Sequence, residues 1–166
     1  MSVTREHVTA ALKPEEPDYD EAVRLGPEAL THLHAIVEEG DPNLAAKAAY
    51  LAGRIGEARA VPILETAAVS PDPSIRAAAA GGLRHLSERQ AEPILLRLVD
   101  DENAGIRKAA LLAVPDFPSL ELEEKLNRRR RVETQPAIRD LADRVHTRVS
   151  INNRRLRGDL PGGNDG

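Results

Sequence analysis

The stretch Asp72-Pro73-Ser74-Ile75-Arg76-Ala77-Ala78-Ala79 decides the fold, because related stretches stand at a fixed distance on either side of it. Asp41-Pro42-Asn43-Leu44 begins 31 residues earlier, and Asn103-Ala104-Gly105-Ile106 begins 31 residues later. A partial fourth copy, Pro136-Ala137-Ile138-Arg139, is displaced by one extra residue. A fixed period in the range of about 20–50 residues indicates a protein built from structural repeats.

Each copy predicts the start and one face of a helix. Asp41 and Asp72 stand where an N-cap is needed, and the proline after each fits the first helical position, whose N–H has no partner within the helix. In the first copy, apolar residues recur at intervals of 4, 3 and 4, which places them on one face: Leu44, Ala48, Leu51 and Ile55. A second, shorter helix is expected to begin near Pro62 or Pro93. Each unit is therefore a helical hairpin that must bury its apolar faces against its neighbours.

These landmarks resemble the signature of the HEAT-repeat family. The resemblance rests on the turn at Asp72, on the aliphatic-arginine pair Ile75-Arg76, which returns as Ile106-Arg107, and on the alanine that follows. The 31-residue unit is most similar to the HEAT-like repeats of the phycobilin-lyase type, and the similarity covers residues 27–150. It implies an all-α fold, a short right-handed α-solenoid of about three to four helical hairpins.

Three positions depart from this repeat pattern. Ala45 stands where the first copy should have arginine, and Pro115 and Pro118 fall late in the third copy. Because an internal proline removes a backbone hydrogen bond, we expect that helix to end early or to kink.

The arginines that recur at one repeat position are interpreted as scaffolding residues that pair with carboxylates such as Asp72 or Asp101: Arg76, Arg107 and Arg139.

The chain is predicted to form a single repeat domain over residues 1–151, followed by a tail. Residues 4–13 and 18–25 indicate two short capping helices before the first full unit, because each has a capping residue at its start and a stop signal near its end. Residues 152–166 contain four glycines and no apolar periodicity, so they are expected to be disordered.

Composition excludes several classes of protein. The chain has no cysteine, which rules out disulfides and thiolate metal sites. It lacks the run of about 20 apolar residues that a membrane span needs, and its start lacks a secretory signal pattern. The sequence therefore predicts a soluble cytoplasmic protein. Aromatic residues are almost missing, so the core must be built mainly from alanine and leucine: only Tyr19, Tyr50 and Phe117 occur.

The resemblance implies that the helices beginning near residues 42, 73 and 104 line a concave surface. Small residues at its centre, flanked by Tyr50 and Leu112, are interpreted as a shallow groove for a partner helix or extended peptide. The alternative is that these small residues only allow consecutive helices to pack closely. The predicted partner-binding residues are Lys47, Tyr50, Arg54, Ala78, Gly81, His85, Lys108 and Leu112.

Charge is distributed unevenly along the chain. Residues 1–40 carry a net charge of −6, whereas residues 125–157 carry +8. A basic patch made of Arg128, Arg129, Arg130, Arg131, Arg144 and Arg148 could contact nucleic-acid phosphates. Alternatively, the run is a solvated helix end, or it binds an acidic protein, including the N-terminus of another copy.

No set of residues predicts catalysis. The five histidines lack metal-binding spacing, and neither a phosphate-binding loop nor a nucleophile–base pair is present. The sequence therefore predicts a non-enzymatic scaffold that binds a protein partner without a cofactor. Nucleic-acid binding through the basic patch is the alternative, and an accessory or lyase-like subunit that acts on a bound chromophore is a minor one. The sequence leaves the oligomeric state open.

Overall fold

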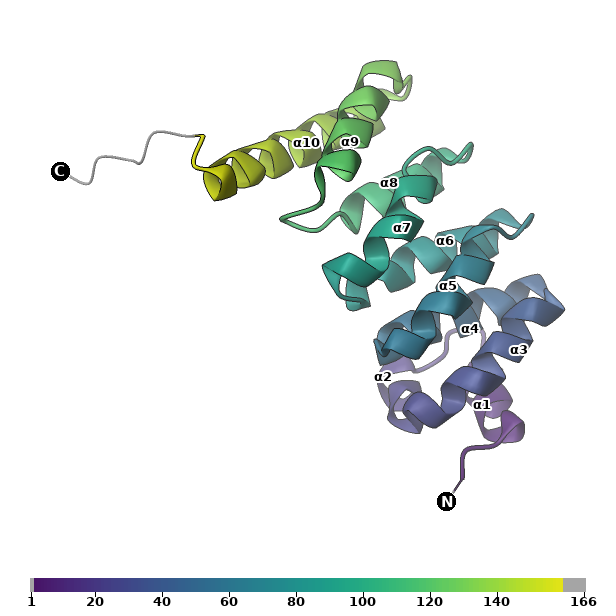
Figure 1. Ribbon diagram of the computed structural model, residues 1–166. Coiled ribbons are helices and arrows are strands. Elements are labelled where there is room, and N and C mark those ends of the chain that lie inside the picture. The colour runs from purple at the N-terminus through teal and green to yellow at the C-terminus, as the bar shows by residue number, and fades with distance from the viewer. Residues whose placement is uncertain (1, 160–166) are drawn as a thin grey trace.

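Residues 2–159, the part of the chain that the structure describes, contain ten α-helices and no strands in the computed structural model (Figure 1). Helices α1 (Arg5–Leu12) and α2 (Tyr19–Ala22) precede four helical hairpins. The hairpins are α3 (Leu30–Glu39) with α4 (Pro42–Ile55), α5 (Val61–Ala68) with α6 (Pro73–Gly82), α7 (Glu88–Leu98) with α8 (Ala104–Leu112), and α9 (Leu120–Val132) with α10 (Pro136–Arg157).

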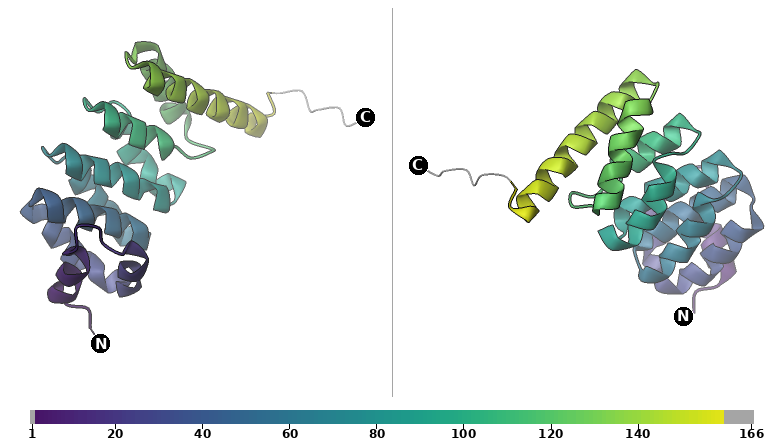
Figure 2. Two further views of the ribbon diagram at one scale, coloured as in Figure 1. Left: turned by 180° about the vertical axis from the view of Figure 1, so that it is seen from behind. Right: turned by 45° about the horizontal axis from the view of Figure 1, so that its top comes forward.

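The hairpins stack in chain order, so that two rows of helices run from one end of the molecule to the other (Figures 1 and 2). Helices α3, α5, α7 and α9 form one row, and α4, α6, α8 and α10 form the other, whose exposed surface we call the inner face. The all-α solenoid that the repeat predicts is confirmed. None of the helices in the described chain is both long and apolar enough to cross a membrane.

The repeated turn residues start the helices of the inner row as expected. The side chain of Asp41 accepts a hydrogen bond from the backbone N–H of Leu44 at 2.9 Å, and Asp72 accepts one from Ser74 at 2.8 Å. Asn103 accepts one from Gly105 at 2.8 Å. These caps satisfy backbone donors that the first turn of a helix leaves without partners.

Two glycines set the closest approach between neighbouring hairpins. A Cβ atom on Gly53 of α4 would lie 2.5 Å from the Cα of Gly82 on α6, a distance that real Cβ atoms do not show. Consecutive helices of the inner row therefore touch backbone to backbone at this point. Gly53 and Gly82 thus allow close helix packing at this point, although neither belongs to the small residues of the predicted groove.

The third hairpin has a short inner helix, as the late prolines predict. Helix α8 ends at Leu112, and residues 113–119 form an irregular connection to α9. Three side chains of α10 donate hydrogen bonds to alternate carbonyls of this connection: Arg148 to Val114 at 3.0 Å, Asn152 to Asp116 at 3.0 Å, and Asn153 to Pro118 at 3.2 Å. These bonds give the carbonyls of the connection the hydrogen-bond donors that backbone N–H groups would have supplied in a longer helix.

The same contacts correct the predicted start of the tail. Helix α10 continues to Arg157 and ends at Gly158, whose φ of 73° is the left-handed conformation typical of a helix C-cap. The expected disorder is thus wrong for residues 152–157, because Asn152 and Asn153 anchor the last turns of the helix to the connection before α9. Residues 160–166, also predicted to be disordered, lie outside the described part of the chain.

Candidate functional site

Buried arginines connect successive hairpins. Arg76 donates from Nε to Oδ2 of Asp101 at 2.8 Å and from Nη2 to Oδ1 at 3.1 Å, while its Nη1 donates to the carbonyls of Ser70 and Pro71. The predicted pairing with Asp101 is therefore confirmed, and Asp72 serves as a helix cap instead.

Arg107 repeats this arrangement one unit later. It forms a bidentate pair with Glu133 at 2.7 and 2.9 Å, and its Nη1 donates to the carbonyls of Asp101 and Glu102. Hydrogen bonds from Arg107 lower the pKa of Glu133 to about 2, and the Glu133 carboxylate raises the pKa of Arg107. Both side chains are nearly inaccessible to solvent, so this pair has a structural role.

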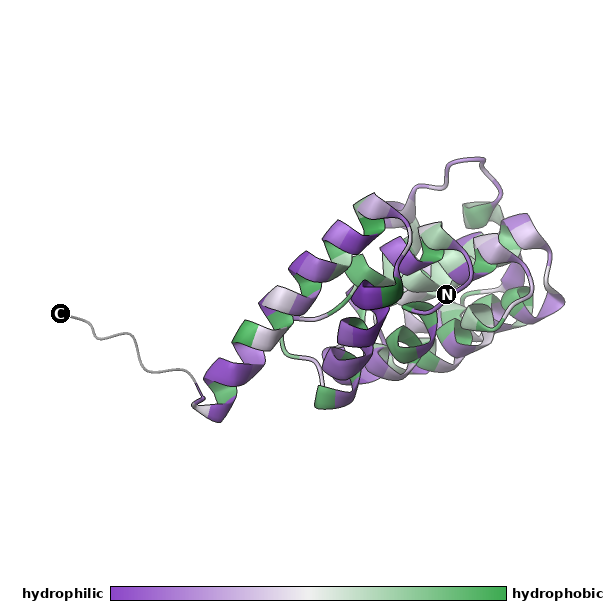
Figure 3. Cartoon of the chain, turned by 90° about the horizontal axis from the view of Figure 1, so that it is seen from above, coloured by the Kyte–Doolittle hydropathy of each residue, from purple (hydrophilic) through white to green (hydrophobic). Residues whose placement is uncertain are grey.

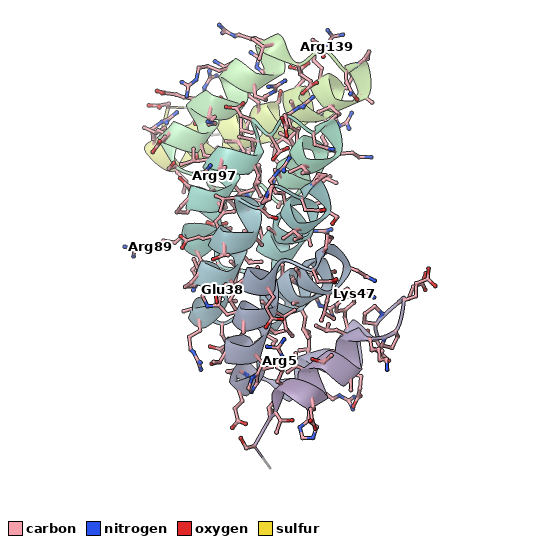
Figure 4. The ribbon with its side chains drawn as sticks, turned by 90° about the vertical axis from the view of Figure 1, so that its right-hand side faces the viewer. Arg5, Glu38, Lys47, Arg89, Arg97 and Arg139 are labelled. Carbon is pink, nitrogen blue, oxygen red and sulfur yellow. The ribbon has the colours of Figure 1, made fainter. Side chains whose placement is uncertain are left out.

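We define the arginine ladder as Arg76, Arg107 and the equivalent Arg139. Figure 4 labels Arg139 at one end of the stack and Arg5 near the other. Near the N-terminus, Arg5 of α1 forms a bidentate pair with Glu39, which stands 62 residues before Asp101, that is, two repeats earlier. At the other end, Arg139 is exposed, and its side chain makes no hydrogen bond or ion pair with residues 2–159. The ladder therefore connects units within the stack and stops at its last hairpin.

The chain's own N-terminal segment covers the inner face of the first hairpin. The Nζ of Lys47 donates to the carbonyl of Pro14 at 2.7 Å, and Arg54 pairs with Asp20. The ring of Tyr19 meets that of Tyr50 edge to face, with 4.8 Å between ring centroids and 79° between ring planes. Sequence reasoning missed this cover, because nothing in the local pattern places Tyr19 against a residue 31 positions away.

Tyr50 in turn covers the next hairpin. A Cβ on Gly81 would lie 3.4 Å from the Tyr50 ring, and the ring of His85 stands 6.2 Å from that of Tyr50 between centroids. Burial lowers the pKa of His85, and the positive charges of Arg54 and Arg84 add to this effect. The predicted small-residue groove is therefore partly filled by side chains of the protein itself, although Ala78 remains half-buried.

The inner face is open on the third and fourth hairpins. Leu112 stands one repeat after Gly81, and its side chain is 53% exposed. Lys108, one turn earlier on α8, and Arg144, at the matching repeat position of α10, are both exposed, and neither forms an ion pair with the described residues. Beside Leu112 lies an open hollow of about 350 Å³, whose lining includes Arg84, Leu86, Val114, Asp116 and Arg148. The hollow itself carries charges of both signs, because Glu88 and Asp116 line it together with Arg84 and Arg148.

The arginine run does not form one basic surface. Arg129 pairs with Glu133 at 3.1 Å, and Arg130 pairs with Asp143 at 3.1 Å. Arg128 lies 3.9 Å from Glu124, and Arg131 has no ion pair within the described chain. Of the other two residues of the predicted patch, Arg148 pairs with Asp116, whereas Arg144 belongs to the open inner face. The structure thus divides the predicted phosphate-binding patch among several internal contacts.

A metal site has no support from the described side chains, which contain no cluster of three His, Cys, Asp or Glu residues able to hold an ion. The open hollow on the inner face is lined by aliphatic and charged residues, with Asp116 and Arg148 paired to each other. This arrangement can bind a complementary surface, and the contacts that it offers are apolar packing and hydrogen bonds from guanidinium groups.

Comparisons with known proteins agree with this architecture. A family model described as HEAT repeats matches residues 30–115 and 66–149, which together span most of the chain. The chain belongs to the HEAT-repeat family. It is similar in structure to a chain of the complex of CpcE and CpcF of phycocyanin lyase from Nostoc sp. PCC7120, with a TM-score of 0.70 and 22% sequence identity over 85% of this chain and 96% of that one. No curated protein sequence matches the chain.

Proposed function

We propose that this protein is a non-enzymatic scaffold that holds a protein partner on the open part of its inner face, formed by α8 and α10. The observation that carries the proposal is the exposed Leu112 of α8, together with the exposed Lys108 one turn earlier on the same helix and the exposed Arg144 at the matching repeat position of α10. Neither basic residue forms an ion pair with residues 2–159. Large apolar side chains surrounded by polar groups are typical of the centres of protein-binding sites. As the sequence predicts, we place the protein in the cytoplasm and expect it to need no cofactor.

The N-terminal segment indicates the chemistry of the partner. On the first hairpin, residues 14–20 supply a ring to Tyr50, a carboxylate to Arg54 and a carbonyl to Lys47. Leu112 and Arg144 stand at later repeats of the Tyr50 position. We therefore expect a helical or extended partner segment that combines an apolar side chain with at least one carboxylate. Such a segment would complement the charge of the open inner face.

Site-specific cross-linking tests this proposal. A photoreactive amino acid in place of Leu112 should give a discrete adduct with one protein in the native host, and Arg144→Glu should reduce that adduct at least about tenfold, because it reverses a charge at the centre of the contact. The matched control is the same photoreactive group at Val69, an exposed apolar residue outside the inner row of helices. Equal labelling from both positions, or none from position 112, would contradict the proposal.

A second candidate function is that of a subunit that assists chromophore attachment. Its support is the similarity in fold to a phycocyanin lyase subunit, which extends over nearly all of that chain. Mixing the purified chain with a bilin and recording the visible absorption spectrum tests this candidate. A bilin spectrum that the protein leaves unchanged, both alone and with candidate partner subunits, would count against it.

A further inference from the structure

The apolar face of α10 continues beyond the fold. Ile138, Ala142, Val145 and Val149 are buried on this face. Leu156 follows Val149 by seven residues, which returns it to nearly the same side of the helix, yet its side chain is 69% exposed. The reason is visible in Figures 1 and 3, where the last turns of α10 extend past the rest of the stack.

The end of α10 is also strongly basic. Arg154 and Arg155 precede Leu156, are exposed, and form no ion pair with the described residues. Arg157 is neutralised by Asp159, whose carboxylate lies 3.0 Å away. We call Arg154, Arg155 and Leu156 the helix tip. It presents one unburied leucine next to two guanidinium groups that have no ion-pair partner among residues 2–159.

A groove with an acidic rim lies between α7 and the start of α9. It encloses about 470 Å³ and has an apolar floor formed by Pro93, Leu96 and Phe117, of which Phe117 is 48% exposed. Its rim carries three carboxylates and one arginine: Glu88, Glu92, Glu121 and Arg89. Glu92 accepts a hydrogen bond from the backbone N–H of Ser119 at 3.1 Å, whereas Glu88 and Glu121 have no ion pair within residues 2–159.

We propose that two copies of this chain associate, with Leu156 of each copy inserted into the acidic-rimmed groove of the other. The tip supplies the leucine that the apolar floor can bury, and Arg154 and Arg155 supply charges opposite to those of Glu88 and Glu121. Because Leu156 is mostly exposed in a single chain, it does not occupy the groove of its own copy. Opposite charges beside an apolar contact favour one specific orientation of the two surfaces.

The positions of tip and groove determine the symmetry of this assembly. Asn153, one turn before Leu156, donates a hydrogen bond to the carbonyl of Pro118, while Phe117 and Ser119 line the groove. Tip and groove therefore lie at the same end of the fourth hairpin, so two copies can exchange tips about a twofold axis. Such an exchange closes on itself and produces a dimer rather than a filament.

The contact involves few residues, so the dimer should be weaker than one with a standard interface of about 1,600 Å². Sedimentation analysis of the purified full chain tests this expectation over concentrations of about 5–200 µM. We expect a reversible monomer–dimer equilibrium that shifts toward monomer as salt rises, because exposed charges are screened. Leu156→Asp should raise the dissociation constant at least about tenfold.

The matched control is Val132→Asp. Val132 is 62% exposed at the opposite end of the fourth hairpin, so its replacement should leave the dimer intact. Leu112→Asp should also leave it intact, which separates this proposal from the one for the inner face. A chain that stays monomeric over the whole concentration range, as it would if the groove served a different protein, overturns the proposal. So does a dimer that Leu156→Asp does not weaken.

Exchanging the charges gives a more specific test. Arg154→Glu with Arg155→Glu in one variant, and Glu88→Arg with Glu121→Arg in another, should each prevent self-association. Mixing the two variants should produce a one-to-one dimer, since both of its tip–groove contacts again join opposite charges. Circular dichroism and thermal unfolding establish that both variants are folded. Failure of two folded variants to combine contradicts the assignment of tip to groove.

Discussion

Arg107 on α8 and Glu133, the residue that follows α9, form a bidentate ion pair in which both side chains are almost completely withdrawn from water. Removing one partner of a buried pair leaves an uncompensated charge, which typically costs about 3–5 kcal/mol. We therefore expect Glu133→Gln to lower the free energy of unfolding by about 3 kcal/mol, as measured by urea denaturation. Glu124→Gln is the control, because the pair of Glu124 with Arg128 is exposed and should change stability by less than about 1 kcal/mol. Similar effects of the two changes would be inconsistent with a structural role for the buried pair.

The same carboxylate predicts how stability depends on pH. Hydrogen bonds from Arg107 hold the pKa of Glu133 at about 2 in the folded protein, compared with an ordinary value of 4.5. A carboxylate with a lowered pKa stabilises the fold above its ordinary value, and this contribution is lost as the pH falls through 4.5 toward 2. Unfolding by urea at a series of pH values should show this loss in the wild type. The Glu133→Gln variant should show a shallower decline, and identical slopes would refute the assignment.

Replacing Gly53 and replacing Gly81 by alanine should have opposite effects on the stability of the fold. Gly53→Ala forces a Cβ into the backbone of Gly82, so we expect destabilisation of about 1–3 kcal/mol. Gly81→Ala meets only ordinary contact with the Tyr50 ring, and alanine favours a helix over glycine by up to about 1 kcal/mol. Thermal unfolding of both variants measures the difference. Equal melting temperatures would mean that α4 and α6 can separate without loss of stability.

The N-terminal cover of the inner face should open when its anchors are removed. Tyr19→Ala with Asp20→Ala removes the ring contact with Tyr50 and the ion pair with Arg54. Hydrogen exchange of residues 14–25 should then become at least about tenfold faster, while exchange in α5 to α9 stays unchanged, because local segments can open without global unfolding. The exposed Glu16→Ala is the control. If exchange rises equally throughout the protein, the segment is part of the cooperative core rather than a cover.

The 31-residue period predicted the helices of the inner row because their starts depend on local chemistry. An aspartate cap and a proline in the first turn act within a few residues, and Asp41 and Asp72 do so in the structure. The pairing of Arg76 with Asp101 could also be anticipated, since the repeat places the first turn of α6 beside the connection that precedes α8. Glu133 was missed because one extra residue shifts the fourth copy and moves the carboxylate by one position.

Contacts between distant segments were less predictable. The cover of Tyr50 by Tyr19 depends on how residues 13–18 turn back over α4, which no periodicity specifies.

The sequence did contain a pattern that indicates the full length of α10, but the composition of the segment obscured it. Val145, Val149, Asn153 and Leu156 follow helical spacing, although the surrounding glycines and polar residues favour a tail. The predicted partner-binding residues on the first hairpin lie on the inner face but are engaged internally, whereas Lys108 and Leu112 remain exposed.

Ala45 and Ser70 stand at the two positions that elsewhere hold the arginine and carboxylate of the ladder, so the joint between the first and second hairpins contains no such ion pair. At that joint α4 and α6 instead pack backbone to backbone at Gly53 and Gly82. The connections between successive hairpins therefore differ in what stabilises them along the stack. Acidity, which protonates the carboxylates, should therefore loosen the later connections between hairpins, while the first connection keeps its stiffness, so that the solenoid flexes from its C-terminal half. Added salt should change little, because these ion pairs are buried.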